Sequence, residues 1–153
     1  MLVLAAYYLD ASAAIKAYSE ERGADRVEEI LEHGTEVHIS RVGVVEVAAA
    51  FFGKTKTGEM WMEEAVSALE EFRLDIENTY RIAEIRSVTT ECAIEVAERH
   101  RLRAYDCLQL ATALLLQEQR ASFELAPLVF VSSDAELNAA AEGEGLNVED
   151  PAE

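Results

Sequence analysis

Hydrophobic and polar positions along the chain follow two different periods. Runs of consecutive apolar residues, typical of buried strands, lie at 3–9 and 128–131, with shorter candidates at 36–39 and 146–148. Longer segments carry apolar residues at helical spacing, at 11–19, 22–32, 41–52, 59–72, 90–100, 105–119 and 135–142. Short apolar strands separated by helices predict an α/β sandwich, with a small, mainly parallel sheet under a thick coat of helices.

Several element ends carry their own signals. Ser40 is a good N-cap for the helix that follows it, and Gly53 predicts where that helix stops. The segment 59–72 has an apolar stripe that includes Trp61 and Phe72. The segment 74–80 is ambiguous, because its sequence suits either a loop or a short extended segment. The helix at 105–119 is apolar on nearly every side, which predicts a central position in the fold.

Length and composition limit the class of protein. The chain has 153 residues, half of them hydrophobic. This predicts one domain over 1–153, with a core that is large enough to be stable without disulfides or structural metal ions. Cys92 and Cys107 fit neither a zinc site nor a redox pair, and the three histidines make no ligand pair, so we expect reduced thiols and no zinc. The apolar run at 2–9 is far too short to span a bilayer, so we expect a cytoplasmic protein that contacts no membrane.

Taken alone, the charge balance argues against a nucleic-acid partner. Thirteen lysines and arginines face 30 aspartates and glutamates, a formal net charge of −17. Such a surface repels polyanions at long range.

Glu46 is the carboxylate that fits its surroundings least. It interrupts an otherwise uncharged helical segment, VGVVEVAAAFF, and its helical neighbours are small. A carboxylate on so apolar a helix is either buried at a large free-energy cost or faces a group that compensates its charge. The alternative is a single exposed residue on a half-buried helix.

Three aspartates have related positions. Asp10 and Asp134 each follow an apolar strand and precede a helix, and such junctions share one edge of a parallel sheet, where these folds bind ligands. Asp106 begins the central helix. Each of the three taken alone also suits an ordinary helix N-cap. Together with Glu46 they predict an oxygen-only cluster that suits Mg²⁺ or Mn²⁺ and phosphodiester chemistry.

At these residues the sequence resembles the PIN-domain family, and within it the VapC toxins of prokaryotic toxin–antitoxin pairs. The matching segments are YLDASA at 8–13, SRVGVVEV at 40–47, YDCLQLATA at 105–113 and FVSSD at 130–134. They occur in the family's order and at similar spacing, so the resemblance covers nearly the whole chain.

The resemblance implies a PIN-like three-layer sandwich and a metal-dependent endoribonuclease. It implies that Mg²⁺ or Mn²⁺ is held by the four carboxylates Asp10, Glu46, Asp106 and Asp134, supported by the hydroxyls of Ser12 and Ser132. It further implies an RNA substrate, a homodimer, and inhibition by a cognate antitoxin that wraps over the groove holding the active site. Cys107 stands where the family more often has alanine, a change that should not affect metal ligation.

Two other readings compete with a nuclease. A phosphate-accepting receiver domain would need an acceptor aspartate on a central strand and a lysine after a late strand, and no lysine follows 128–131. A non-catalytic PIN-like binding module would fit the charge of −17, and failure to bind Mn²⁺ would reveal it.

Some surface residues have two interpretations. Basic residues near the acidic motifs either guide an RNA strand or are ordinary solvated charges: Lys16, Arg41, Lys54, Lys56, Arg101 and Arg103. The sequence Met60-Trp61-Met62 and the pair Phe51-Phe52 suit either a dimer or antitoxin interface or ordinary core packing.

Overall fold

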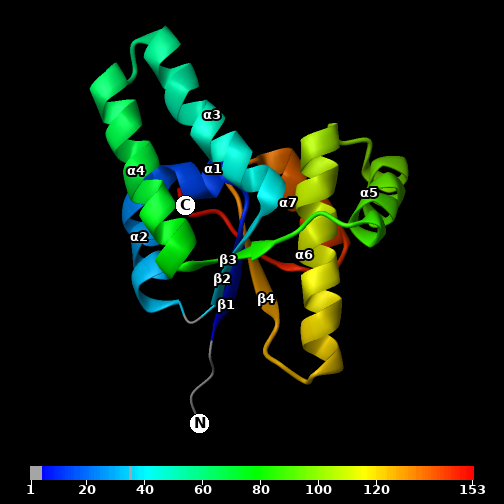
Figure 1. Ribbon diagram of the computed structural model, residues 1–153. Coiled ribbons are helices and arrows are strands. Elements are labelled where there is room, and N and C mark those ends of the chain that lie inside the picture. Colours follow the sequence, from blue (N-terminus) through cyan, green and yellow to red (C-terminus); the bar gives the residue numbers. More distant parts are fainter. Residues whose placement is uncertain (1–4, 35) are drawn as a thin grey trace.

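The computed structural model describes residues 5–34 and 36–153, and a five-stranded sheet runs through its centre (Figure 1). Its spatial order is β3-β2-β1-β4-β5, and every pair of neighbours is parallel. The strands are β1 (Ala6–Leu9), β2 (Glu36–Ser40), β3 (Tyr80–Ala83), β4 (Leu128–Val131) and β5 (Asn147–Glu149). The predicted parallel sheet is therefore confirmed, while Val3 and Leu4 lie outside the described residues.

Helices cover both faces of the sheet and make three layers. One face carries the helices α1 (Ala11–Ala14), η1 (Ile15–Tyr18, a 3-10 turn), α2 (Ala24–His33), α3 (Arg41–Thr57) and α4 (Met62–Asn78). The other face carries α5 (Ser87–His100), α6 (Ala104–Ser122) and α7 (Ala135–Gly143) (Figure 1). Because side chains alternate along a strand, Leu9 packs into the first core and Tyr8 into the second. The three-layer sandwich is confirmed.

Aromatic contacts hold each of the two cores. Tyr18, Phe51, Phe72 and Tyr80 meet edge to face, with ring centroids 5.3 to 6.1 Å apart. The packing interpretation of Phe51 is therefore the correct one. In the second core, the ring of Tyr8 stacks on that of Phe130 at 5.6 Å.

Three predicted boundaries were wrong. Helix α3 continues through Gly53 and ends at Gly58, whose φ of +80° suits a glycine C-cap. A side chain at Gly53 would meet no atom within 4 Å, and one glycine in an exposed helix costs only about 1 kcal/mol, too little to end it. Helix α4 continues past its predicted end at 72 to Asn78 and takes up most of the ambiguous segment 74–80, and α5 begins at Ser87, three residues before the predicted start at 90.

Trp61 was predicted on the apolar stripe of its helix, and that placement was also wrong. It precedes α4 as the N-cap residue and is 77% exposed, while the neighbouring Met60 is buried. Its backbone N–H donates to Glu64.

Both cysteines are unpaired, and the helices are limited in length and hydrophobicity. Cys107 is buried, Cys92 is half-buried, and both are free thiols. Within residues 5–34 and 36–153, every helix is too short or too polar to cross a lipid bilayer.

Candidate active site at the carboxyl edge of the sheet

The strand order places two predicted acids beside each other. From β1 the chain passes to β2 and β3 on one side, whereas β4 and β5 lie on the other side. The carboxyl ends of the adjacent strands β1 and β4 therefore form the topological switch point of the sheet, where open α/β folds bind ligands. The N–H of Asp10 donates to the carbonyl of Val131 at 3.1 Å and continues the pairing of the two strands beyond their ends.

Asp10 is the most deeply held of the four carboxylates. It is 4% exposed, and one oxygen, Oδ1, accepts from the Ser12 hydroxyl at 2.7 Å and the Ala13 N–H at 3.0 Å. The other oxygen, Oδ2, accepts from the Ser132 hydroxyl at 2.8 Å. Burial raises the pKa of Asp10 to about 6, although these three hydrogen bonds oppose the shift. Asp10 thus caps α1 and also presents a buried, oriented carboxylate.

Ser12 and Ser132 join the ends of β1 and β4. Besides contacting Asp10, the Ser12 oxygen accepts from the N–H of Ser133 at 3.0 Å, and the Ser132 oxygen accepts from the N–H of Asp134 at 3.1 Å. Both serines that the resemblance implied as supporting residues therefore contact Asp10.

Glu46 lies on α3, six residues after the N-cap Ser40, whose oxygen accepts from the N–H of Gly43 at 2.9 Å. It is half-buried, and its Oε1 accepts from Nε2 of Gln109 on α6 at 2.7 Å. Burial raises the pKa of Glu46, the charge of Asp106 adds to the increase, and the Gln109 hydrogen bond opposes it. Glu46 is therefore directed toward α6 by its hydrogen bond with Gln109.

Asp106 and Asp134 complete the acidic edge. Helix α6 begins at Ala104, so Asp106 is the third residue of its first turn and not the cap that the sequence allowed. Burial raises the pKa of Asp106, and the nearby charge of Asp134 adds to the increase. Asp134 caps α7 by accepting from the N–H of Leu137 at 3.1 Å.

The four carboxylates interact as a row. Asp10 feels the charge of Glu46, Glu46 that of Asp106, and Asp106 that of Asp134. In the described part of the chain, no three His, Cys, Asp or Glu side chains are arranged to hold a metal ion as they stand. The chemistry of the donor set nevertheless fits a hard divalent cation, because every donor is a carboxylate oxygen and mutual repulsion falls when a cation lies among them.

Sequence reasoning missed Gln109 as a site residue. The helix around it was interpreted as apolar, yet Gln109 is 1% exposed and contacts Glu46. The sequence did carry a signal for Gln109, because it is a polar residue between Leu108 and Leu110 on an apolar helix. Like Glu46, such a residue needs a polar partner when it is buried.

Comparison with known proteins identifies the family. The family model of the PIN domain matches residues 7–143, a span that includes all four carboxylates. The chain belongs to the PIN-domain family. PIN domains are in general nucleases that use divalent metal ions. Among curated proteins, no sequence matches this chain.

Solved structures share the PIN fold at low sequence identity. PAE2754 from Pyrobaculum aerophilum is 20% identical, with a TM-score of 0.64, and the match covers 95% of this chain and 90% of that one. A toxin–antitoxin complex from Klebsiella pneumoniae is 18% identical, with a TM-score of 0.63 and coverage of 95% and 98%. FitAcB from Neisseria gonorrhoeae is 18% identical, with a TM-score of 0.62 and coverage of 95% and 97%.

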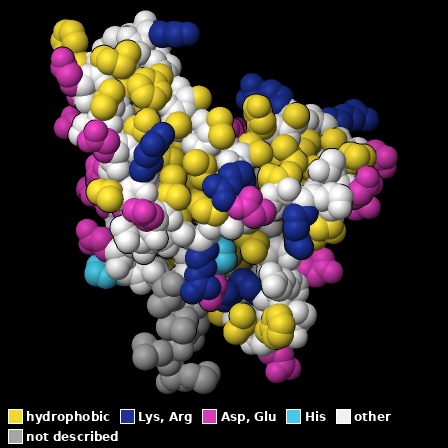
Figure 2. Space-filling model, viewed as in Figure 1, with side chains coloured by type: hydrophobic (Ala, Val, Ile, Leu, Met, Phe, Trp, Pro, Cys, Tyr) yellow, Lys and Arg dark blue, Asp and Glu magenta, His cyan; other side chains and the backbone are white. Residues whose placement is uncertain are grey.

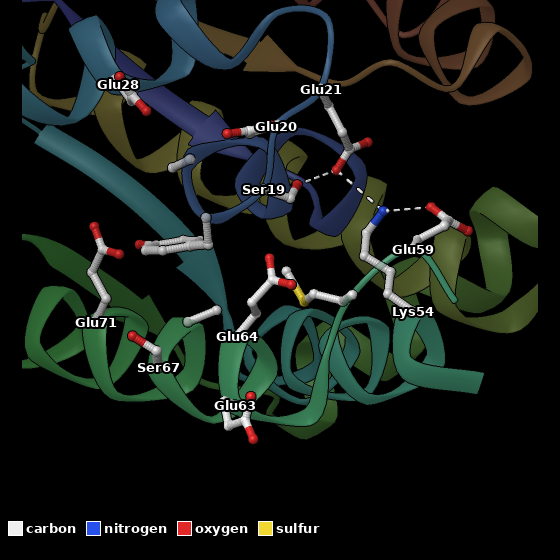
Figure 3. A pocket seen from close by; sticks show the side chains of 14 residues that line it. Ser19, Glu20, Glu21, Glu28, Lys54, Glu59, Glu63, Glu64, Ser67 and Glu71 are labelled. Atoms are coloured by element: carbon white, nitrogen blue, oxygen red, sulfur yellow. Dashed lines mark hydrogen bonds and ion pairs between the residues drawn. The ribbon is translucent and has the colours of Figure 1, made fainter. Parts of the chain in front are cut away.

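A second acidic region of this PIN domain lies apart from the carboxylate edge. We call it the acidic groove, a cavity of about 840 Å³ between η1 and the loop that follows it, the middle of α2, the end of α3, and α4 (Figure 3). Only Lys54 carries a positive charge among its lining side chains, and it pairs with Glu21 at 3.5 Å and Glu59 at 3.1 Å. The groove glutamates are Glu20, Glu21, Glu28, Glu59, Glu63, Glu64 and Glu71.

The basic residues near the acidic motifs are mostly paired. Lys16 is buried 3.9 Å from Glu21, and Arg41 binds the exposed Glu84 through two hydrogen bonds. Arg103 is paired as well, since it lies 4.0 Å from Asp106, but its side chain is 90% exposed.

The face drawn in Figure 2 is rich in apolar side chains over α3 and the neighbouring ends of α5 and α6. Val45 on α3 is 66% exposed and Tyr105 on α6 is 60% exposed, and each is next in sequence to one of the acids. Acidic side chains lie mostly around the margin of this face.

Proposed function

We propose that this PIN domain is a metal-dependent endoribonuclease of the VapC toxin type. The observation that carries the proposal is the row Asp10, Glu46, Asp106 and Asp134. These acids come from four separate elements, and buried side chains hold three of them, since Ser132 contacts both Asp10 and the N–H of Asp134 and Gln109 contacts Glu46. In this proposal the four carboxylates hold Mg²⁺ or Mn²⁺.

A bound divalent ion supplies an activated water and neutralises the charge of the phosphodiester. The chain itself supplies orientation. Asp10 is fixed by two serines, and Glu46 by Gln109, so both can keep their positions as substrate enters. Asp106 and Asp134 are half-buried.

Proton transfer falls to the carboxylates in this mechanism. The three histidines are engaged elsewhere, since His33 lies 3.8 Å from Glu32, His38 lies 3.3 Å from Glu36, and His100 lies 2.6 Å from Glu144. A carboxylate with a raised pKa is a suitable acceptor for the proton of the attacking water.

The proposal includes an antitoxin partner. The Klebsiella pneumoniae structure with the same fold is a toxin–antitoxin complex. The net charge of −17 and the acidic groove complement a basic protein segment better than they complement RNA. We also keep the homodimer as part of this proposal, and sedimentation of the purified protein tests it.

The decisive experiment is cleavage of a mixed RNA pool with Mn²⁺ or Mg²⁺, comparing the wild type with Asp10→Asn and Asp106→Asn. Glu63→Gln, in the acidic groove, is the matched control because it removes an exposed carboxylate from another region. We expect metal-dependent cleavage by the wild type and the control, and a loss of at least about 100-fold in both aspartate variants.

The other results have distinct meanings. Equal cleavage by all four proteins would indicate a contaminating nuclease or a wrong site. No cleavage by any of them, together with no Mn²⁺ binding by calorimetry, would favour a non-catalytic PIN-like binding module.

A further inference from the structure

One buried side chain connects Glu46 to the interior of the protein. The amide of Gln109 bonds on one side to Glu46 and on the other to two hydroxyls. Its Oε1 accepts from the hydroxyl of Tyr8 and from Ser40 Oγ at 3.4 Å. The network thus joins β1, the end of β2, α3 and α6.

The orientation of the Gln109 amide follows from its partners. An ionised carboxylate only accepts hydrogen bonds, so the NH₂ group of Gln109 must face Glu46 and its oxygen must face the hydroxyls. Ser40 Oγ already accepts from Gly43, which leaves its hydrogen free to donate. Tyr8 is 0% exposed and its ring stacks on Phe130, so its hydroxyl cannot swing away.

The backbone of α3 is shaped to admit this amide. A Cβ added at Gly43 would lie 3.2 Å from Gln109 Nε2 and 3.3 Å from Ser40 Oγ, tighter than ordinary contact. Glycine therefore lets the first turn of α3 approach α6 closely enough for Gln109 to reach Glu46 one turn further on.

We propose that Gln109 is a positioning residue, which holds the Glu46 carboxylate in one orientation, while Tyr8 and Ser40 fix the direction of its amide. That Gln109 thereby favours metal binding by Glu46 rests on the proposed function. A buried side chain that satisfies three polar groups at once also stabilises the fold, so a test must separate position from stability.

The test compares the wild type with Gln109→Met and Tyr8→Phe. Methionine has nearly the length of glutamine but no donor, and phenylalanine keeps the ring contact with Phe130 but removes the hydroxyl. Gln117→Met is the matched control, since Gln117 lies two turns further along α6 and accepts from the N–H of Leu128 at 2.7 Å, away from the acids. Two readouts are used: the Mn²⁺ dissociation constant from calorimetry, and the position of Glu46 in metal-free crystal structures.

We expect Gln109→Met to weaken Mn²⁺ binding by about 10- to 100-fold, the usual effect of losing a partner that orients a ligand. Tyr8→Phe should weaken it a few-fold. Gln117→Met should lower the melting temperature without changing the dissociation constant. Glu46 should keep one side-chain conformation in the wild type and leave it in Gln109→Met.

Unchanged Mn²⁺ affinity and an unmoved Glu46 in Gln109→Met would overturn the inference. If the wild type binds no Mn²⁺ and cleaves no RNA, the proposed function fails, and the crystal structures still decide whether Gln109 positions Glu46. If Gln109→Met does not fold, Tyr8→Phe decides in the same way, since it keeps the shape of the core.

Discussion

The carboxylate edge and the acidic groove are both rich in acids, yet they differ in how the protein surrounds each carboxylate. At the edge, Asp10 and Glu46 accept hydrogen bonds from side chains that are themselves buried, such as Ser132 and Gln109. In the groove, exposed residues such as Glu63 lie on solvent-facing turns of α4 (Figure 3).

The difference shows why a count of acids says little about function. Exposed carboxylates stay solvated, so the groove costs the fold little, apart from mutual repulsion that Lys54 reduces. Carboxylates held inside a polar network lose hydration, and the protein keeps them only with oriented donors or a cation nearby. The edge therefore has the organisation of a site, whereas the groove has that of a charged surface.

The largest expected contrast is in RNA cleavage. Glu46→Gln should lower kcat/KM by at least about 100-fold, because the variant loses a negative donor from the row. The double variant Glu63→Gln/Glu71→Gln removes two charges from the groove and should change the same rate less than about two-fold. A large loss in the groove variant would show that the groove contributes to RNA cleavage, and would contradict the distinction between a site at the edge and a charged surface in the groove.

The second contrast is in stabilisation by metal. Saturation with Mn²⁺ at about 100 times its dissociation constant should stabilise the wild type by about 2.7 kcal/mol. Thermal melts with and without Mn²⁺ should show an increase in melting temperature for the wild type and the groove double variant, but none for Asp10→Asn. An equal increase in all three would place the bound ion outside the carboxylate edge.

The third contrast is in the pH dependence of stability without metal. Because Asp10 has a folded pKa of about 6, above its unfolded value of 3.8, the folded state binds more protons between these two values. The free energy of unfolding should therefore fall as pH rises from about 4 to 6, and Asp10→Asn should remove this fall, with a gain of about 1–3 kcal/mol at pH 7.

Urea unfolding at several pH values in the presence of a chelator measures this effect. Glu63→Gln serves as the control, and its pH profile should parallel that of the wild type. A wild-type profile without a decrease between pH 4 and 6 would mean that Asp10 is not held in a buried, charge-disfavouring position.

The smallest expected effect is in the groove. Lys54→Met removes the one cation among the described residues that line the groove, leaves Glu21 paired only with Lys16, and should destabilise the protein by about 1 kcal/mol at low salt. The loss should shrink in 1 M NaCl because salt screens repulsion between exposed charges. Lys56→Met, an exposed position on the same helix, should change the unfolding free energy less, and equal losses in both variants would contradict a groove-specific effect.

Much of the architecture was predictable from local sequence. The apolar runs located β1 and β4, helical spacing located α2 and the central α6, and Ser40 marked the start of α3. These signals are local, because a strand end, a helix period and an N-cap each depend on residues within a few positions. The same logic placed Asp10 and Asp134 at strand ends on one edge of the sheet, whereas the adjacency of β1 and β4 came from the structure.

Other features depended on tertiary packing. The exposure of Trp61 and the passage of α3 through Gly53 reflect which helix faces find partners, and weak local preferences cannot decide this.

The hydrogen bond from Gln109 to Glu46 joins residues 63 positions apart and exists only because α3 and α6 pack together. The sequence by itself thus determined which acids lie in apolar segments or at the ends of apolar strands. Only the tertiary structure decided which buried groups hold them, because burial and hydrogen-bond geometry are properties of packed elements and not of the chain order.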